Sequence, residues 1–155
     1  MAESFIIAEG TKQQQYESLM LQMKPVIDNS AGMISNMANM CAMLKAQFNW
    51  LWVGFYLVCN QELQVGPYQG PLACTKIQKG KGVCGAAWAE AGTIIVPDVN
   101  QFNGHIACSS LSQSEIVVPV YRNEKIVAVF DADSEQQNGF DETDRIYLQQ
   151  IMLFL

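Results

Sequence analysis

Residues 114–121, SEIVVPVY, and residues 124–133, EKIVAVFDAD, are two runs rich in β-branched side chains with a polar dipeptide between them. This arrangement predicts a β-hairpin that turns around Arg122–Asn123. The two strands of a hairpin are antiparallel, so the start of the first strand and the end of the second meet at one end of the sheet. The stretch therefore predicts an antiparallel sheet.

Other strands lie on the N-terminal side of this hairpin. WLWVGFYLVC at 50–59 is the clearest of them, and residues 61–68 are expected to return beside it. The glycine-rich turn KGKGVCG at 79–85 leads into a short helix at about 84–90, and IIVPDV at 94–99 predicts another short strand. The Gly-rich turn lacks the Walker spacing, which excludes a nucleotide-phosphate loop.

Helices are expected at both ends of the chain, over about 11–24, 30–47 and 141–155. Asp141 is placed to cap the last of them. The second helix carries an apolar stripe, which indicates core packing or a subunit interface: Met33, Met37, Met40, Leu44 and Phe48. Helices that flank a run of strands predict an α+β fold, in which a central antiparallel sheet has helices packed against it.

Length and charge limit the possible functions. The 155 residues suit one domain, 1–155, with N-terminal helices at about 11–47, a sheet with its loops at about 50–134, and a C-terminal helix at about 141–155. The net charge is −6 and the nine Lys and Arg are scattered, which argues against a nucleic-acid partner. No apolar run approaches the roughly 20 residues of a membrane span. The N-terminal residues lack a secretory pattern, so a cytoplasmic location is expected.

Five cysteines, an odd number at wide spacing, argue against a structural disulfide framework in a reducing compartment. There is no CxxC pair and only one His, so no structural zinc site is expected. Cys74, Cys84 and Cys108 are predicted outside regular elements, either as reactive thiols or as small loop residues. Cys84 is expected near a helix N-terminus, which favours a thiolate. His105 is either a structural residue or a base.

Three acids are candidates for one cluster. Asp131 and Asp133 lie two residues apart on one strand and therefore on one face. A two-residue turn at Asn123–Glu124 places Glu115 on the opposite face, whereas a shift of one residue brings the three carboxylates together. Solvated acids at strand ends are the alternative to a cluster.

Trp52 and Tyr56 are expected on one face of the 50–59 strand, with Gly54 between them. The missing side chain at Gly54 predicts a slot between two aromatic walls, suited to a small apolar or cationic group. Aromatic core packing is the alternative.

Taken together, these segments resemble the free methionine-(R)-sulfoxide reductase family, whose members are single GAF domains. The resemblance covers about residues 30–155 in order. It rests on these stretches: WVGFYLV at 52–58, ELQVGPYQGPLAC at 62–74, GKGVCG at 80–85, VPDV at 96–99, GHIACSS at 104–110, SEIVVPV at 114–120 and FDADS at 130–134.

The resemblance implies roles for the three cysteines. Cys108 matches the nucleophile that attacks the sulfoxide sulfur and becomes a sulfenic acid. Cys74 matches the cysteine that resolves it to a disulfide, and Cys84 matches a third cysteine that assists. Thioredoxin is then the expected reductant, in a cytoplasmic homodimer that acts against oxidative stress.

The resemblance also implies a substrate site without a metal or a tightly bound cofactor. Glu115, Asp131 and Asp133 match the acids that hold free methionine-(R)-sulfoxide, while Trp52 and Tyr56 match the aromatic wall at its methyl end.

The chain departs from the family pattern at Ser109, where the family usually has Asp. This change removes a negative charge beside the expected nucleophile. A non-catalytic GAF module that binds a small molecule and a peroxide-responsive redox sensor remain the alternative functions.

Overall fold

The computed structural model describes residues 5–106 and 108–155, and in this part of the chain six strands form one sheet in the order β3-β2-β1-β6-β5-β4. Every neighbouring pair is antiparallel. The strands are β1 Trp52–Cys59, β2 Glu62–Gln69, β3 Lys76–Gln78, β4 Ile94–Val96, β5 Ser114–Arg122 and β6 Lys125–Ser134. The helices are α1 Lys12–Met23, α2 Met33–Phe48, α3 Gly82–Glu90 and α4 Glu142–Met152, with short 3-10 helices at η1 Lys24–Val26 and η2 Val99–Gln101.

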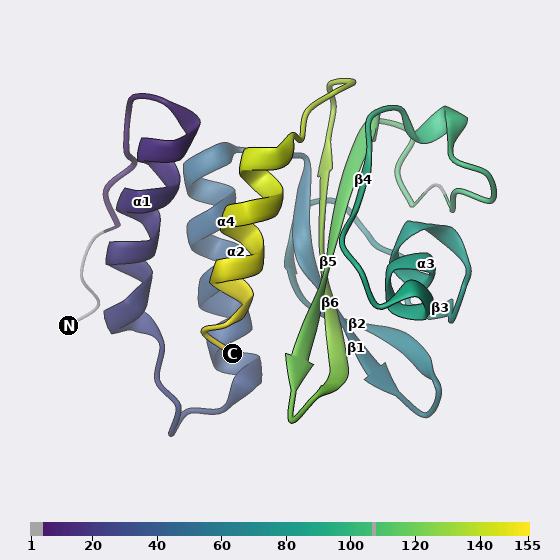
Figure 1. The fold of residues 1–155 in the computed structure, drawn as a ribbon, viewed down its shortest axis with the longest axis horizontal. Helices are drawn as coiled ribbons and strands as arrows, with labels where there is room; N and C mark the ends of the chain where they lie inside the picture. Colours follow the sequence, from purple (N-terminus) through teal and green to yellow (C-terminus); the bar gives the residue numbers. More distant parts are fainter. Residues whose placement is uncertain (1–4, 107) are drawn as a thin grey trace.

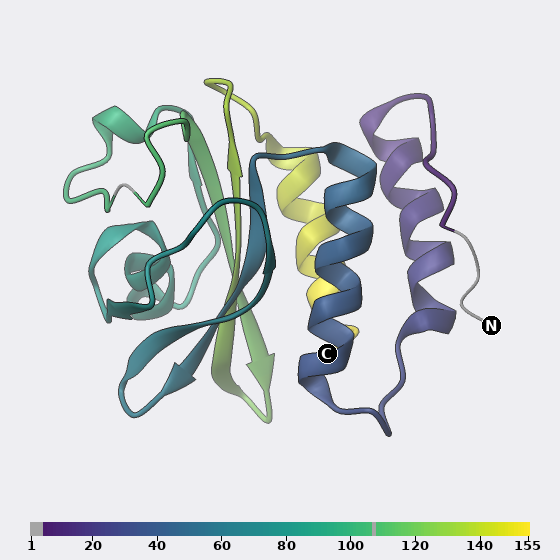
Figure 2. The same cartoon turned by 180° about the vertical axis from the view of Figure 1, so that it is seen from behind.

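The elements form layers on the two faces of the sheet (Figure 1). Helices α2 and α4 cover one face with α1 outside them, and α3 lies on the other face with the long loops. Figure 2 shows the same order from behind. The expected α+β class is confirmed, because both faces of the sheet bury apolar side chains under helices. None of the described helices is long and apolar enough to cross a membrane.

The predicted helices are present, and capping residues mark the N-termini of α1 and α4. Thr11 caps α1 through a reciprocal pair of hydrogen bonds with Gln14, and Asp141 caps α4 in the same way with Asp144. Helix α2 begins at Met33, later than expected, because Gly32 takes a φ of 87° that a helix cannot include. Its methionine stripe lies in the core: Met37, Met40 and Leu44 are fully buried within one chain. The stripe is therefore not a free subunit interface.

The hairpin of β5 and β6 turns at Asn123–Glu124, both of which have positive φ. Arg122 pairs with Lys125, but the register shifts by one residue between Val120 and Tyr121. The shift leaves Val127 as an extra residue on β6, which is a β-bulge. Beyond the bulge, Glu115 pairs with Asp133 rather than with Ala132.

Two details of the sheet differ from expectation. Alternation along the strand predicted over 50–59 would place Trp50 on the face of Trp52, yet Trp50 packs against Phe48 and Phe140 in the helix-side core. It precedes β1, so the alternation of the strand does not reach it. The short strand β3 was not predicted at all, because three residues carry too little pattern.

Candidate active site

The three candidate acids converge on the face of the sheet that α3 covers. Glu115 on β5 pairs with Asp133 on β6, and Asp131 lies two residues before Asp133 on the same face. Glu115 and Asp131 are each 6% exposed. The bulge at Val127 therefore selects the arrangement in which the carboxylates cluster.

Crowding and burial change the proton affinity of this cluster. Burial raises the pKa of Glu115 and of Asp131 well above the usual range, and the charges of the neighbouring carboxylates raise both further. Burial also raises the pKa of Asp133 to about 6, although hydrogen bonding from Ser112 works against that rise. The cluster therefore keeps protons at a pH where exposed carboxyl groups have lost theirs.

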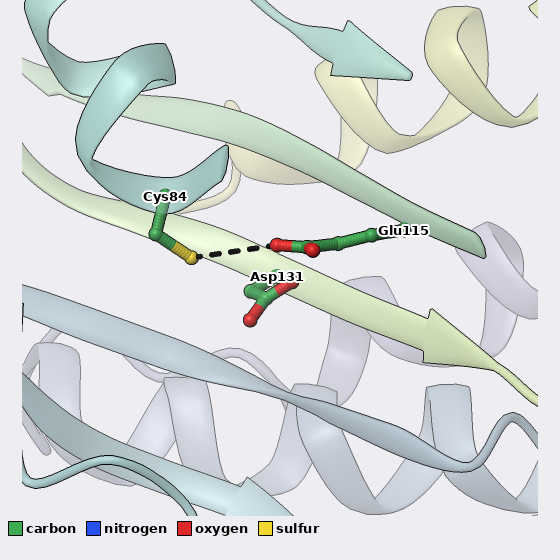
Figure 3. A group of neighbouring side chains, drawn as sticks. All are labelled: Cys84, Glu115 and Asp131. Carbon is green, nitrogen blue, oxygen red and sulfur yellow. Dashed lines mark hydrogen bonds between the residues drawn. The ribbon is translucent and has the colours of Figure 1, made fainter. Parts of the chain in front are cut away.

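Cys84 faces this cluster from α3, and its Sγ lies 3.9 Å from Glu115 Oε1 (Figure 3). Two expectations about it are wrong. It is the third residue of a helix rather than part of a loop. Burial and the charges of Asp131 and Glu115 raise the pKa of its thiol well above the usual value. The helix N-terminus is worth too little to offset the loss of water and two adjacent negative charges.

Gly85 explains how α3 comes so close to the sheet edge. A Cβ at this position would lie 2.4 Å from the carbonyl oxygen of Gln78, which is the last residue of β3. Only glycine allows this approach, and the approach fixes the position of Cys84, the residue before it in the first turn of α3.

Cys74 and Cys108 are joined by a disulfide, with their Cα atoms 5.7 Å apart. Cys74 lies half-buried in the loop between β2 and β3, and Cys108 is exposed in the loop before β5. Cys84 remains a free thiol, as do Cys41 and Cys59. Two of the three expected reactive cysteines are therefore already paired, and the third lies among the acids.

Trp52 and Tyr56 lie on the same face as the acids, with ring centroids 5.8 Å apart. The slot expected at Gly54 is absent, because a Cβ there would lie 2.4 Å from the Trp52 ring. The ring of Trp52 itself covers Gly54 and stacks on Tyr68 as well. The aromatic side chains form one continuous wall instead of two.

Two further side chains touch the acids. His105 Nε2 lies 3.5 Å from Glu115 Oε2, which is an ion pair when the imidazole is protonated. Ser112 donates a hydrogen bond from its hydroxyl to Asp133. The sequence analysis identified His105 as a candidate but did not predict that Glu115 is its partner. It gave no sign of Ser112, because a serine three residues before a strand acid is an ordinary loop residue.

Most of these groups line one cavity, whereas His105, Cys74 and Tyr68 lie outside its lining. Its lining includes one sulfur of the disulfide, the thiol of Cys84, the three carboxylates, the aromatic wall and Ser109. Two buried polar atoms at the cavity have no hydrogen-bond partner among the described residues, the indole Nε1 of Trp52 and Oδ1 of Asp131. An orphaned donor and an orphaned acceptor indicate that the cavity is built for a polar ligand.

Comparisons with known proteins find relatives that match nearly the whole chain. A family model described as "GAF domain" matches residues 37–153. The chain is 53% identical to GAF domain-containing protein A of Dictyostelium discoideum, over 100% of this chain and 99% of that protein. It is 38% identical to the free methionine-R-sulfoxide reductase of Saccharomyces cerevisiae, over 90% of this chain and 83% of the relative.

The fold is similar to that of a solved enzyme. The structure of free methionine-R-sulfoxide reductase from Neisseria meningitidis in complex with its substrate matches with a TM-score of 0.94 and 46% identity. The match covers 97% of this chain and 92% of that chain. The similarity therefore extends through the sheet, α3 and the loops that form the cavity.

Proposed function

Because the chain belongs to the free methionine-(R)-sulfoxide reductase family of GAF domains, we propose that it reduces free L-methionine-(R)-sulfoxide to L-methionine with its own cysteine thiols. The observation that carries this proposal is the disulfide between Cys74 and Cys108 at the mouth of a cavity lined by three carboxyl groups. A disulfide at a ligand cavity is the product expected when one thiol reduces a ligand and a second thiol resolves the intermediate.

The first step takes place at Cys108. In the reduced enzyme its thiol attacks the sulfoxide sulfur and forms a sulfur–sulfur bond, while the protonated oxygen leaves the substrate sulfur as water. A water molecule then adds to the Cys108 sulfur, the sulfur–sulfur bond breaks, and methionine leaves with Cys108 as a sulfenic acid. A carboxyl group in the cluster supplies a hydrogen bond or a proton to the sulfoxide oxygen. The raised pKa of Glu115 and Asp131 keeps such a proton bound at a higher pH than an exposed carboxyl group does.

The second step takes place at Cys74. Its thiol attacks the sulfenic sulfur, a sulfur–sulfur bond forms, and water leaves. Cys84 is a less suitable partner for this step, because burial and two carboxylates hold its proton in place. We therefore assign resolution to Cys74 and a position in the substrate pocket to Cys84.

The acids also explain why the substrate is a free amino acid. The α-ammonium group of free methionine sulfoxide is cationic, and the cluster offers it negative charge even when Glu115 or Asp131 holds a proton, because Asp133 has a pKa of about 6. A methionine sulfoxide within a polypeptide has an amide at that position and gains nothing from the cluster. Trp52 and Tyr56 supply the apolar surface for the methyl end of the side chain.

The reductant that restores the thiols is proposed to be thioredoxin. Cys108 is exposed, and the apolar side chains of Leu72 and Leu111 in the two cysteine loops are 86% and 56% exposed. Such a surface beside an accessible disulfide suits a protein with a reduced dithiol. Catalysis by free thiols needs a reducing compartment, which supports the expected cytoplasmic location and a role against oxidative stress.

The proposed function is tested by NADPH consumption in a thioredoxin-coupled assay, with the R and S epimers of free methionine sulfoxide side by side. We expect turnover of the R epimer alone. Dithiothreitol in place of thioredoxin separates the chemistry from the choice of reductant. Oxidation of the thiols by peroxide, with no reduction of either epimer, would contradict the proposal and favour a redox sensor.

We also propose that the protein is a homodimer. The methionine stripe of α2 is buried within the chain and does not support this. Support comes instead from exposed apolar side chains of the helical layer, Leu21 on α1 and Ile34 on α2, which are 72% and 50% exposed. Light scattering is expected to give twice the chain mass of 17.2 kDa, and Leu21→Glu to give that of one chain. A wild-type protein with the mass of one chain would overturn the proposal.

A further inference from the structure

Three potential metal ligands meet in the cavity from three separate elements, Cys84 on α3, Glu115 on β5 and Asp131 on β6. One ligand atom from each, the sulfur and two carboxylate oxygens, lies within 4.8 Å of the other two, and all three residues are buried (Figure 3). They are 31 and 16 residues apart in sequence, so no ligand spacing marks them. The sequence alone argued against a zinc site for that reason.

A second observation indicates that this cluster lacks a cationic partner. Asp131 is only 6% exposed, and its Oδ1 has no hydrogen-bond partner. Among the described residues no lysine or arginine forms an ion pair with Glu115 or Asp131, and the imidazole of His105 lies within ion-pair distance of Glu115 but not of Asp131. A buried carboxylate oxygen without a donor in a cluster of acids is a position that a cation stabilises.

We propose that the substrate-free cavity binds Zn²⁺ through Cys84 Sγ and one carboxylate oxygen each from Glu115 and Asp131. A thiolate with two carboxylates is a donor set that Zn²⁺ accepts, whereas Mg²⁺ and Ca²⁺ require shells of oxygen. Water in the cavity fills the fourth position, as in zinc sites with three protein ligands. On binding, the thiol of Cys84 gives its proton to solvent and its sulfur bonds the metal.

The required movement is small. Ligand atoms of a tetrahedral zinc site lie roughly 3.5 Å apart, as follows from bonds of about 2.0–2.3 Å. The present separations are within 4.8 Å and so exceed that value by at most about 1.3 Å, a distance on the scale of a side-chain rotation of Glu115 or Asp131. Helix α3 does not need to move, which matters because Gly85 fixes it against β3.

Metal binding has a consequence for the reaction, and this part alone rests on the proposed function. The carboxylates that hold the metal are those proposed to hold the ammonium group and to donate to the sulfoxide oxygen. Zn²⁺ and substrate therefore exclude each other. The metal makes the enzyme responsive to free zinc and protects the thiol of Cys84 from oxidation.

Binding is tested on the protein with the Cys74–Cys108 disulfide intact, so that neither of these sulfurs can hold a metal. Titration with Co²⁺ is expected to give a sulfur-to-cobalt charge-transfer band and the intense visible bands of a tetrahedral site. Zn²⁺ is expected to displace the cobalt. Cys84→Ser should lose the charge-transfer band, whereas Cys59→Ser, which removes a thiol outside the cavity, should keep it.

Asp131→Asn provides a second variant that keeps the thiol and the shape of the side chain. It is expected to weaken Co²⁺ binding at least about tenfold, since it removes one charged ligand. Circular dichroism and melting confirm that each variant is folded. A wild-type protein without the charge-transfer band, or a band that survives Cys84→Ser, would overturn the site.

Inhibition is measured separately, as methionine formed in a single turnover by reduced enzyme from which small thiols have been removed. Zn²⁺ is expected to suppress methionine formation by wild type, and excess substrate or a chelator to restore it. Cys84→Ser should lose this sensitivity to zinc, which separates the proposed site from zinc held by the thiols of Cys74 and Cys108. Full turnover with the metal bound would overturn the exclusion of substrate by zinc. An enzyme inactive without any metal would contradict the proposed function, while the cobalt spectrum would still decide the metal site.

Discussion

Cys108→Ser is expected to lower kcat/KM for free methionine-(R)-sulfoxide by at least about a thousandfold, the scale of loss seen when a nucleophile is removed. A serine hydroxyl does not form an anion near neutral pH and does not attack sulfur as a thiolate does. The thiol of Cys84 is not expected to replace it, because Cys84 is buried among carboxylates that raise its thiol pKa. The measurement is methionine produced in the thioredoxin-coupled assay.

Cys74→Ser is the matched control for this variant. It keeps the nucleophile and is expected to make methionine once, then to stop at the sulfenic acid of Cys108, which dimedone traps and mass spectrometry locates. Cys84→Ser should still form the Cys74–Cys108 disulfide. Multiple turnovers by Cys108→Ser would refute the assignment of the nucleophile. Steady turnover by Cys74→Ser would move resolution to Cys84.

The helices and the fold class could be predicted because their signals are local. The apolar stripe of α4 and the capping acids Asp141 and Asp144 lie within one stretch of sequence, and the structure contains the corresponding contacts. The faces of β1 followed likewise from alternation between Val53 and Phe55 on one side and Trp52 and Tyr56 on the other.

The convergence of the acids could not be predicted from sequence, because it depends on one residue. The turn lies at Asn123–Glu124, and the regular pairing from that turn places Glu115 opposite Ala132. The bulge at Val127 corrects the register, and a valine within a run of β-formers carries no mark of a bulge. The position of the bulge depends on how neighbouring strands and helices pack against the hairpin.

The position of Cys84 near a helix N-terminus predicted a lowered thiol pKa, whereas burial and nearby acids raise it. The reason is related to that for the acids. The position of Cys84 near a helix N-terminus is a local property, and it was predicted correctly from the sequence. The effect that dominates its pKa comes from Asp131 and Glu115, which lie on other elements. Electrostatic properties of a buried site depend on groups brought together by the fold, so sequence spacing says little about them.

The acid cluster is expected to lower the stability of the protein, and Asp131→Asn tests this. Burial and the neighbouring charges raise the pKa of Asp131 in the folded state above its value in the unfolded chain. A raised carboxyl pKa means that the folded state binds the proton more tightly. Its contribution to stability is therefore full at low pH and is lost as the pH rises through the folded pKa.

Wild-type protein is accordingly expected to melt at a lower temperature at pH 8 than at pH 5. Asp131→Asn keeps the shape, removes one charge and should melt several degrees higher than wild type at pH 8, with a flatter pH dependence. Glu135→Gln removes an exposed charge near the same strand and serves as the control, with a melting curve close to that of wild type. The measurement is thermal unfolding followed by circular dichroism across this pH range.

The same substitution is expected to lower kcat/KM for free methionine-(R)-sulfoxide by about a hundredfold, because the substrate loses a charged partner in a site shielded from water. It should lower kcat/KM much less for the N-acetylated substrate, which has no ammonium group to lose. A variant that melts lower than wild type at pH 8 would show that Asp131 stabilises the fold. A gain in stability with a loss of activity would show that the repulsion among these acids is retained for the sake of substrate binding.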